Sequence, residues 1–122
     1  MPSRVLVGTD GSATAARAVQ RAVEVAAAAS ASLTILSVGD RSRAENVVSA
    51  AAAEHASAGI AIDTVVRDGD PVEELVASAG SGDYDLLVLG NRGMTGLSRL
   101  LGSVPGKVMH RLPCDLLIVK TT

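Results

Sequence analysis

The sequence predicts a single α/β domain: a mainly parallel, doubly wound sheet with helices on both faces, giving three layers. Short apolar runs alternate with longer segments of helical spacing along the 122 residues, a length that suits one domain. Most of the apolar runs are continuous, as in the Leu-Leu-Val-Leu of residues 86–89, whereas the run at residues 60–66 alternates. Continuous runs are typical of strands buried on both faces, which favours parallel pairing.

The first third of the chain predicts a strand, a helix and a second strand. Val5–Gly8 is a β-branched run ending in glycine, and Thr9–Ser12 is a turn in which Ser12 suits a helix N-cap. A helix is expected from Ala13 to Ala29, because small apolar residues recur there at helical spacing: Ala15, Val19, Ala22, Val23 and Ala26. The second strand is expected at Leu33–Val38.

The rest of the chain continues this alternation. Asp70 is expected to cap a helix that begins at Pro71, with Glu73 and Glu74 in a first turn that favours carboxylates. The other expected elements are a helix at Arg43–Ala58 closed by Gly59, strands at Ile60–Val66, Asp85–Leu89 and Leu116–Val119, and a short helix ending near Arg111 after the glycine-rich segment Gly90–Gly106.

Charge and composition exclude several classes of function. The chain has 11 Lys and Arg against 13 Asp and Glu, a net charge of −2, with one Tyr and no Phe or Trp. Nucleic-acid-binding proteins normally carry a basic surface or aromatic stacking residues, so we expect no nucleic-acid partner. A single cysteine, Cys114, forms no internal disulfide, and no apolar run suits a signal peptide or a membrane span. We therefore expect a cytoplasmic protein without a membrane partner.

The most informative segment is the glycine-rich stretch. Gly90 and Gly93 follow a buried strand, and Gly102-Ser103 stands at the expected start of a helix. Glycines let backbone N–H groups approach a phosphate, and a helix N-terminus offers unpaired N–H donors to an anion. Residues 86–114 contain no acidic residue but four basic ones, Arg92, Arg99, Lys107 and Arg111. This pattern fits a polyphosphate site, and equally a basic loop with glycine caps and no ligand.

Three segments together resemble the universal stress protein family over essentially the whole chain. They are the opening Val5-Leu6-Val7-Gly8-Thr9-Asp10-Gly11-Ser12, the motif Gly90-x-x-Gly93 with Gly102-Ser103-Val104, and the ending Cys114-Asp115-Leu116-Leu117-Ile118-Val119-Lys120. The resemblance implies a five-stranded, Rossmann-like or flavodoxin-like sheet in the order 3-2-1-4-5, with a nucleotide cleft above strands one and four. Two features depart from the family pattern: eight residues, not nine, separate Gly93 from Gly102, and the usual extension after strand two shrinks to Gly39–Ser42.

The resemblance also implies which residues bind the nucleotide, all of them at or after the carboxyl ends of strands. Gly8, Thr9 and Asp10 are expected beside it, with Asp10 near the ribose or adenine, and Val38 offers backbone groups to the adenine edge. Gly90, Asn91, Arg92 and Gly93 line the ribose and first phosphate, while Gly102, Ser103 and Val104 hold the distal phosphates. Considered by itself, Asp10 is better explained as a turn residue that bonds its own backbone.

The function that the resemblance implies is binding of ATP, or a related adenine nucleotide such as AMP, by a stress-response sensor or regulatory module. One alternative is a member that binds cyclic AMP, since a shortened loop is less of a handicap for a single phosphate. Another is a dimeric interaction module that binds no nucleotide. A response-regulator receiver needs a lysine after strand five; it is disfavoured because Lys120 directly continues the apolar run of that strand and is expected to belong to it.

The same residues bear on catalysis, metals and assembly. No second acid accompanies Asp10 and the loop has no lysine equivalent, so we assign no catalytic residues and expect slow ATP hydrolysis at most. Mg²⁺ is expected only in company with the phosphates, because the chain shows no ligand cluster of its own. Strand five is too apolar to be left as a bare edge, and the resemblance implies a homodimer paired through it.

Overall fold

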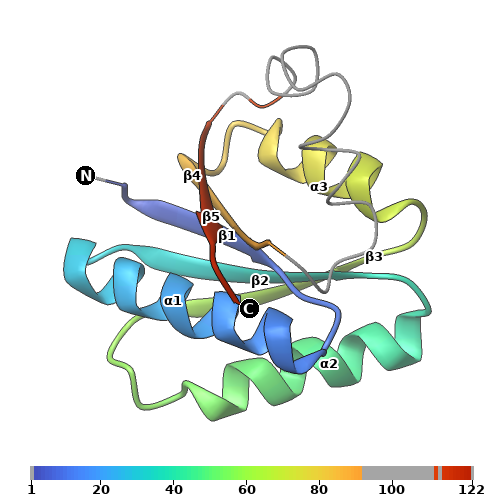
Figure 1. The fold of residues 1–122 in the computed structure, drawn as a ribbon, viewed down its shortest axis with the longest axis horizontal. Helices are drawn as coiled ribbons and strands as arrows, with labels where there is room; N and C mark the ends of the chain where they lie inside the picture. Colours follow the sequence, from blue (N-terminus) through green and yellow to red (C-terminus); the bar gives the residue numbers. More distant parts are fainter. Residues whose placement is uncertain (1, 92–111, 113, 122) are drawn as a thin grey trace.

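In the computed structural model, five strands form one parallel sheet in the order β3-β2-β1-β4-β5 (Figure 1). The structure describes residues 2–91, 112 and 114–121. The elements are β1 (Arg4–Gly8), α1 (Ala13–Ala29), β2 (Ser32–Val38), α2 (Arg41–Glu54), β3 (Ile62–Arg67), α3 (Pro71–Ala79), β4 (Leu86–Gly90) and β5 (Asp115–Val119). The predicted fold class and strand order are confirmed.

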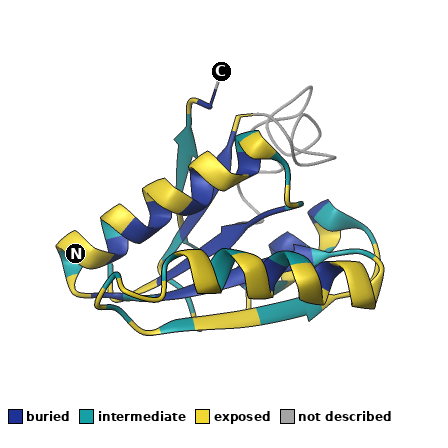
Figure 2. Ribbon diagram, turned by 90° about the horizontal axis from the view of Figure 1, so that it is seen from below, coloured by how far each residue is buried: buried dark blue, intermediate teal, exposed yellow. Residues whose placement is uncertain are grey.

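Among the described residues, two helices cover one face of the sheet and one helix covers the other. Helices α1 and α2 pack on one face and α3 on the other, and Figure 2 shows the buried side of each helix turned towards the sheet. On the first face, the core joins Val5, Val7 and Ile35 to the small side chains of α1. On the second, Leu6 and Leu36 pack with Leu75 of α3. Adjacent strand residues serve opposite cores because side chains alternate across a strand.

Helix α1 begins and ends where the sequence predicts. The Ser12 side chain accepts a hydrogen bond from the Ala15 N–H at 3.2 Å, which caps the first turn. All five residues of the predicted apolar face are buried. Helix α3 likewise begins at Pro71, and Asp70 accepts from the Glu73 N–H at 3.0 Å. No helix in residues 2–91, 112 and 114–121 has the length and apolarity needed to cross a membrane.

The predicted bounds of α2 and β3 are wrong by a few residues. Helix α2 spans Arg41–Glu54 instead of 43–58, because Asp40 caps it, accepting from the Arg43 N–H at 3.1 Å. After Glu54 the chain leaves the helix through tighter turns, such as His55 N–H to the Ala52 carbonyl at 3.2 Å. Alanines continue through this region, so helix propensity does not mark the end. Strand β3 accordingly begins at Ile62, not at residue 60.

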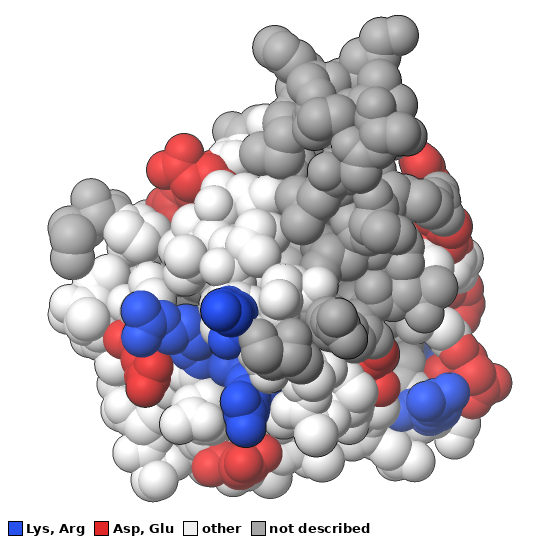
Figure 3. All heavy atoms as spheres, in the orientation of Figure 1, with Lys and Arg blue, Asp and Glu red and all other residues white. Residues whose placement is uncertain are grey.

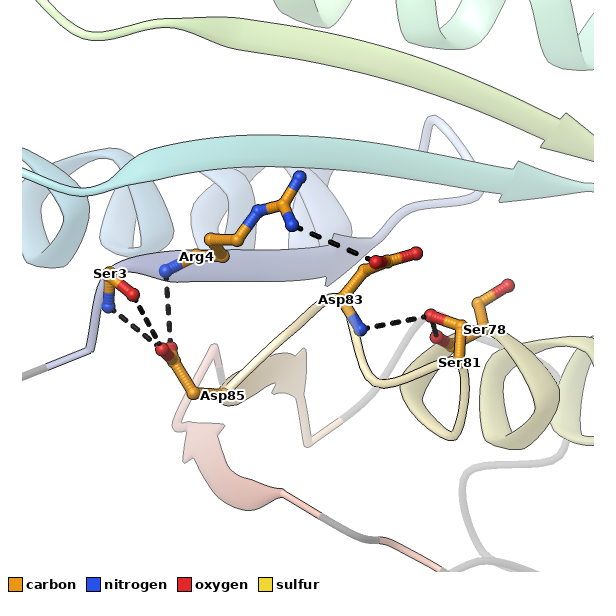
Figure 4. A network of polar contacts seen from close by, with 6 residues as sticks. All are labelled: Ser3, Arg4, Ser78, Ser81, Asp83 and Asp85. Carbon is orange, nitrogen blue, oxygen red and sulfur yellow. Dashed lines mark hydrogen bonds and ion pairs between the residues drawn. The ribbon is translucent and has the colours of Figure 1, made fainter.

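A polar network closes the amino end of the sheet (Figure 4). The Asp85 carboxylate, just before β4, accepts hydrogen bonds from the Ser3 N–H and hydroxyl at 3.0 Å and from the Arg4 N–H at 3.2 Å. These bonds lower the pKa of Asp85, led by that from the Ser3 N–H, since they stabilise the ionised form. Arg4 also faces Asp83 at 3.8 Å. The network therefore holds the start of β1 against the start of β4, at the edge opposite the strands' carboxyl ends.

Candidate functional site

A hollow of about 220 Å³ lies at the carboxyl ends of β1 and β2. In parallel α/β sheets this edge is where ligands bind. The hollow is lined by the turn after β1, the end of β2, the first turns of α2 and the start of α3: Thr9, Asp10, Ser37, Val38, Gly39, Asp40, Arg43, Ala44, Val47 and Pro71. Its wall combines two carboxylates and one guanidinium with small apolar side chains. It thus offers a small ligand both polar and apolar contacts.

The turn after β1 is held by its own side chains. The Thr9 hydroxyl accepts from the Gly11 N–H at 3.1 Å, and Asp10 Oδ1 accepts from the Ser12 N–H at 2.9 Å. Asp10 therefore makes the backbone-bonding turn that its sequence context favours, while it also lines the hollow. Gly11 has a φ of +84°, a conformation that suits glycine. The turn fixes Thr9 and Asp10 at the mouth of the site.

The end of β2 turns backbone groups towards the hollow. Leu33 and Gly39 donate their N–H groups to Ala61 and Arg67 on the β3 side, so odd-numbered residues face β3. Even-numbered residues face β1: the Leu36 carbonyl accepts from the Thr9 N–H at 2.9 Å. The N–H and carbonyl of Val38 follow this alternation towards β1, which has already ended at Gly8. Val38 therefore presents a donor and an acceptor side by side where β1 no longer covers them.

The first turn of α2 contributes residues that the sequence analysis did not assign. Asp40 and Arg43 line the hollow because α2 begins at Arg41, directly after its N-cap Asp40 and two residues earlier than predicted. The sequence does contain a signal for this early start of α2: Asp40 is a suitable N-cap, and the short connection after β2 leaves no room for a loop. Ala44 and Val47 of the same helix and Pro71 of α3 complete the apolar wall.

The end of β4 lies at the same edge, on the other side of β1. Gly90 is buried there, and Asn91 donates its N–H to the Val119 carbonyl at 2.9 Å. The Asn91 side-chain oxygen accepts from the Thr121 N–H at 2.9 Å and hydroxyl at 2.8 Å. Among the expected residues, then, Thr9, Asp10 and Val38 meet at the hollow, with Gly8 buried beneath them. The described contacts of Asn91 go to Val119, the last residue of β5, and to Thr121 just beyond it.

The sequence model of the universal stress protein family matches residues 1–54 and 40–120. The chain belongs to the universal stress protein family. The two matched stretches overlap at residues 40–54, where α2 follows β2 after a two-residue junction.

Relatives that align over nearly their full length support the same family assignment. Universal stress protein Rv1636 of Mycobacterium tuberculosis H37Rv is 36% identical over 141 aligned positions, which cover 97% of this chain and 96% of the relative. Universal stress protein YxiE of Bacillus subtilis 168 is 30% identical, with 98% and 100% covered. A crystal structure of a universal stress protein in complex with cAMP has 40% identity and a TM-score of 0.81, covering 99% of this chain and 98% of the other. Solved structures of 20% and 19% identity from Archaeoglobus fulgidus share the fold, with TM-scores of 0.74 and 0.75.

The remaining expected site residues of this universal stress protein, Arg92, Gly93, Gly102, Ser103 and Val104, lie outside the described residues, as does the short helix expected before Arg111. Cys114 is half-buried against the α3-side core. Burial raises the pKa of its thiol, with smaller contributions from the nearby Asp115 and Asp85 charges, so the reactive thiolate is disfavoured. Cys114 therefore serves as a small packing residue.

Proposed function

We propose that this universal stress protein binds an adenine nucleotide, with the base in the hollow between the ends of β1 and β2. The observation that carries the proposal is the orientation of Val38, whose N–H and carbonyl are directed to the side where β1 has ended. Adenine presents an acceptor, N7, next to the donor N6–H₂ on one edge. A strand residue with an exposed N–H and carbonyl pairs with such an edge and excludes bases with the opposite pattern.

The sugar and phosphates would then extend across β1 towards β4. Thr9 and Asp10 stand between β2 and β4 at this edge, within reach of the ribose hydroxyl groups. The glycine-rich segment that follows Gly90 supplies backbone N–H groups and the basic residues of an acid-free stretch for the phosphates. Residues 2–91, 112 and 114–121 contain no group of three His, Cys, Asp or Glu side chains suited to a metal ion. Any Mg²⁺ would therefore be held chiefly by the phosphates.

The ligand expected from the motif is ATP, and a specific observation favours cAMP as the second candidate. A universal stress protein solved in complex with cAMP is 40% identical to this chain over nearly its whole length. A cyclic nucleotide has one phosphate, which makes less demand on a segment that is one residue short between Gly93 and Gly102. In either case, we propose a cytoplasmic sensor or regulatory module of the stress response. The bound nucleotide would be its signal, with at most slow hydrolysis.

Two measurements test the nucleotide and its site. Mass spectrometry of the small molecules released from freshly purified protein should detect an adenine nucleotide. Titration calorimetry with ATP, AMP and cAMP should then rank the affinities. If the protein releases no adenine nucleotide and shows no heat with any of the three, the proposal is wrong and an interaction module is favoured.

Substitutions test the glycine-rich segment separately. Gly102→Val should abolish nucleotide binding, because a branched side chain blocks the approach of backbone N–H groups to phosphate. Ser103→Ala should weaken binding by roughly 1.5–3 kcal/mol, the contribution of a hydrogen bond to a charged group. Circular dichroism should show both variants folded. Unchanged affinity of Gly102→Val would place the phosphates elsewhere while leaving the base site at Val38 open.

A further inference from the structure

Arg43 differs from the other arginines of the structure in having no protein partner there. Six arginines lie in the described residues, and five of their side chains contact an acceptor. Arg4, Arg21 and Arg41 pair with carboxylates at 3.5–3.8 Å. Arg17 and Arg67 donate to backbone carbonyls at 3.4 and 3.2 Å. Arg43 makes no such contact within the described residues, and it alone among them lines the hollow.

Arg43 lies beside the proposed position of the base and not beside that of the phosphates. It stands in the first turn of α2, three residues after Asp40 and close to the end of β2. The sheet order places β2 and β4 on opposite sides of β1, so Arg43 is on the far side of β1 from Gly90, where β4 ends. Figure 3 shows blue and red atoms adjoining at the right of the molecule, where α2 begins in Figure 1.

Chemistry gives Arg43 a role that no other lining residue can fill. A planar guanidinium stacks on aromatic rings and is attracted to their faces. The chain has no Phe or Trp, and its one Tyr, Tyr84, lines a different depression beside α3. Apart from Arg43, the described residues of the wall beside Val38 offer a base only small aliphatic or short polar groups. Among the described residues that line the hollow, Arg43 is therefore the one whose side chain has a planar cationic group to stack on an aromatic ring.

We infer that Arg43 stacks on the adenine ring and covers the face that the short β2–α2 connection leaves open. This inference rests on the proposed function, because it requires the base to occupy the hollow. Arg43 is then a base-binding residue supplied by the helix, and its contribution is the same for every adenine ligand whatever the number of phosphates.

The test compares Arg43→Ala and Arg43→Lys with a matched control two residues away. Arg41→Ala removes an arginine from the same turn, but Arg41 pairs with Glu45 at 3.6 Å and does not line the hollow. Alanine is a good helix former and keeps the N–H that Asp40 accepts from, so α2 remains capped. Titration calorimetry is run with adenosine, which has no phosphate, and with cAMP and ATP.

We expect Arg43→Ala to weaken binding of adenosine and of both nucleotides by the same factor, about five- to ten-fold. Arg43→Lys should recover part of the loss, and Arg41→Ala should bind as the unchanged chain does. A loss confined to cAMP and ATP would assign Arg43 to the phosphate and overturn the inference. Equal affinities for Arg43→Ala and the unchanged chain would also overturn it, while the proposed function would stand. Absence of binding by the unchanged chain would overturn both.

Discussion

Asp85 is a surface residue whose side chain accepts hydrogen bonds from the backbone at the start of β1. Its carboxylate receives three hydrogen bonds from Ser3 and Arg4, and these lower its pKa. A group whose pKa is lower in the folded chain stabilises the fold above its unfolded pKa, near 3.9, and this stabilisation is lost as the pH falls through the folded value. Asp85 therefore contributes at neutral pH and ceases to contribute in acid.

We predict that Asp85→Asn lowers the free energy of unfolding by about 1 kcal/mol at pH 7, because charge-assisted bonds become weaker neutral ones. Urea denaturation measured from pH 7 to pH 2 should show the difference from the unchanged chain shrinking below about pH 4. The exposed Asp63 of β3 provides a control, Asp63→Asn, which should leave stability unchanged at every pH. A difference that persists at pH 2 would show that the charge of Asp85 is not the cause.

Gly11 combines a left-handed backbone with a close neighbour. Its φ is +84°, and a Cβ added there would lie 3.0 Å from Val47 Cγ2 of α2. Gly59 has a similar φ of +78° with nothing within 4 Å of such a Cβ. The two glycines therefore separate the cost of the backbone conformation from the cost of the contact.

We predict that Gly59→Ala costs about 1 kcal/mol of stability and Gly11→Ala costs more. Adding Val47→Ala to Gly11→Ala should reduce the extra loss of stability at Gly11, since it removes the clashing methyl groups. Thermal denaturation of the unchanged chain, Gly59→Ala, Gly11→Ala and the Gly11→Ala/Val47→Ala double variant measures this. The Gly11→Ala variant should also bind nucleotide more weakly, because Gly11 holds the turn that carries Asp10. If both glycine variants lost the same stability, the Val47 contact would have no energetic role.

At the scale of elements, local signals decide how well the sequence predicts each one. Helix α1 was predicted to the residue because Ser12 caps it and a regular apolar face fills it. The predicted bounds of helix α2 are wrong for two reasons. Alanines continue beyond its last residue, Glu54, and the N-cap at Asp40 was not assigned. The central strands β1, β2 and β4 are predicted by their apolar runs, since burial on both faces leaves few polar residues in them. The edge strand β3 has no buried residue, and its predicted start is two residues too early.

The site was predictable in part. The family resemblance implies Thr9, Asp10 and Val38, which stand at or directly after the ends of strands, and the structure brings them to one hollow. Arg43 was not predicted, because its place depends on how soon α2 begins after β2, a matter of one or two residues. Asn91 was expected at the ligand, but its bonds to Thr121 depend on where the chain runs after β5. Such contacts between distant segments leave no local pattern.

For the whole molecule, the alternation of strands and helices predicted the layers but not the order of the strands. Parallel strands in different orders have the same local sequence pattern, so the order 3-2-1-4-5 came from the family resemblance and is confirmed by the structure. The order makes β3 and β5 the two edges. Strand β5 carries Leu116, Leu117, Ile118 and Val119, all partly exposed.

We predict that the chain forms a two-fold homodimer through β5, because an apolar edge strand pairs readily with its copy. Light scattering at micromolar concentration should give about twice the chain mass. The Asp115 N–H donates to Asp85 beside β4, so the N–H groups of odd-numbered β5 residues face β4 and that of Ile118 faces the free edge. Ile118→Pro removes that donor without breaking the ladder to β4 and should yield a monomer.

A matched substitution at the other edge provides the control for this dimer. Thr64 of β3 is exposed, and its N–H faces away from β2, so Thr64→Pro makes the same change at the opposite edge. It should leave the dimer intact, with circular dichroism confirming that both variants fold. A monomeric unchanged chain, or dissociation by Thr64→Pro alone, would contradict pairing through β5.

The junction of Gly39 and Asp40 makes this fold a convenient host for a guest peptide. The ladder of β2 ends at Val38, the cap of α2 begins at Asp40, and a side chain at Gly39 would meet nothing within 4 Å. A segment spliced between the two residues leaves both elements intact and emerges on the rim of the hollow. A dye carried on such a graft would report occupancy of the hollow directly, which makes this small chain a scaffold for a biosensor.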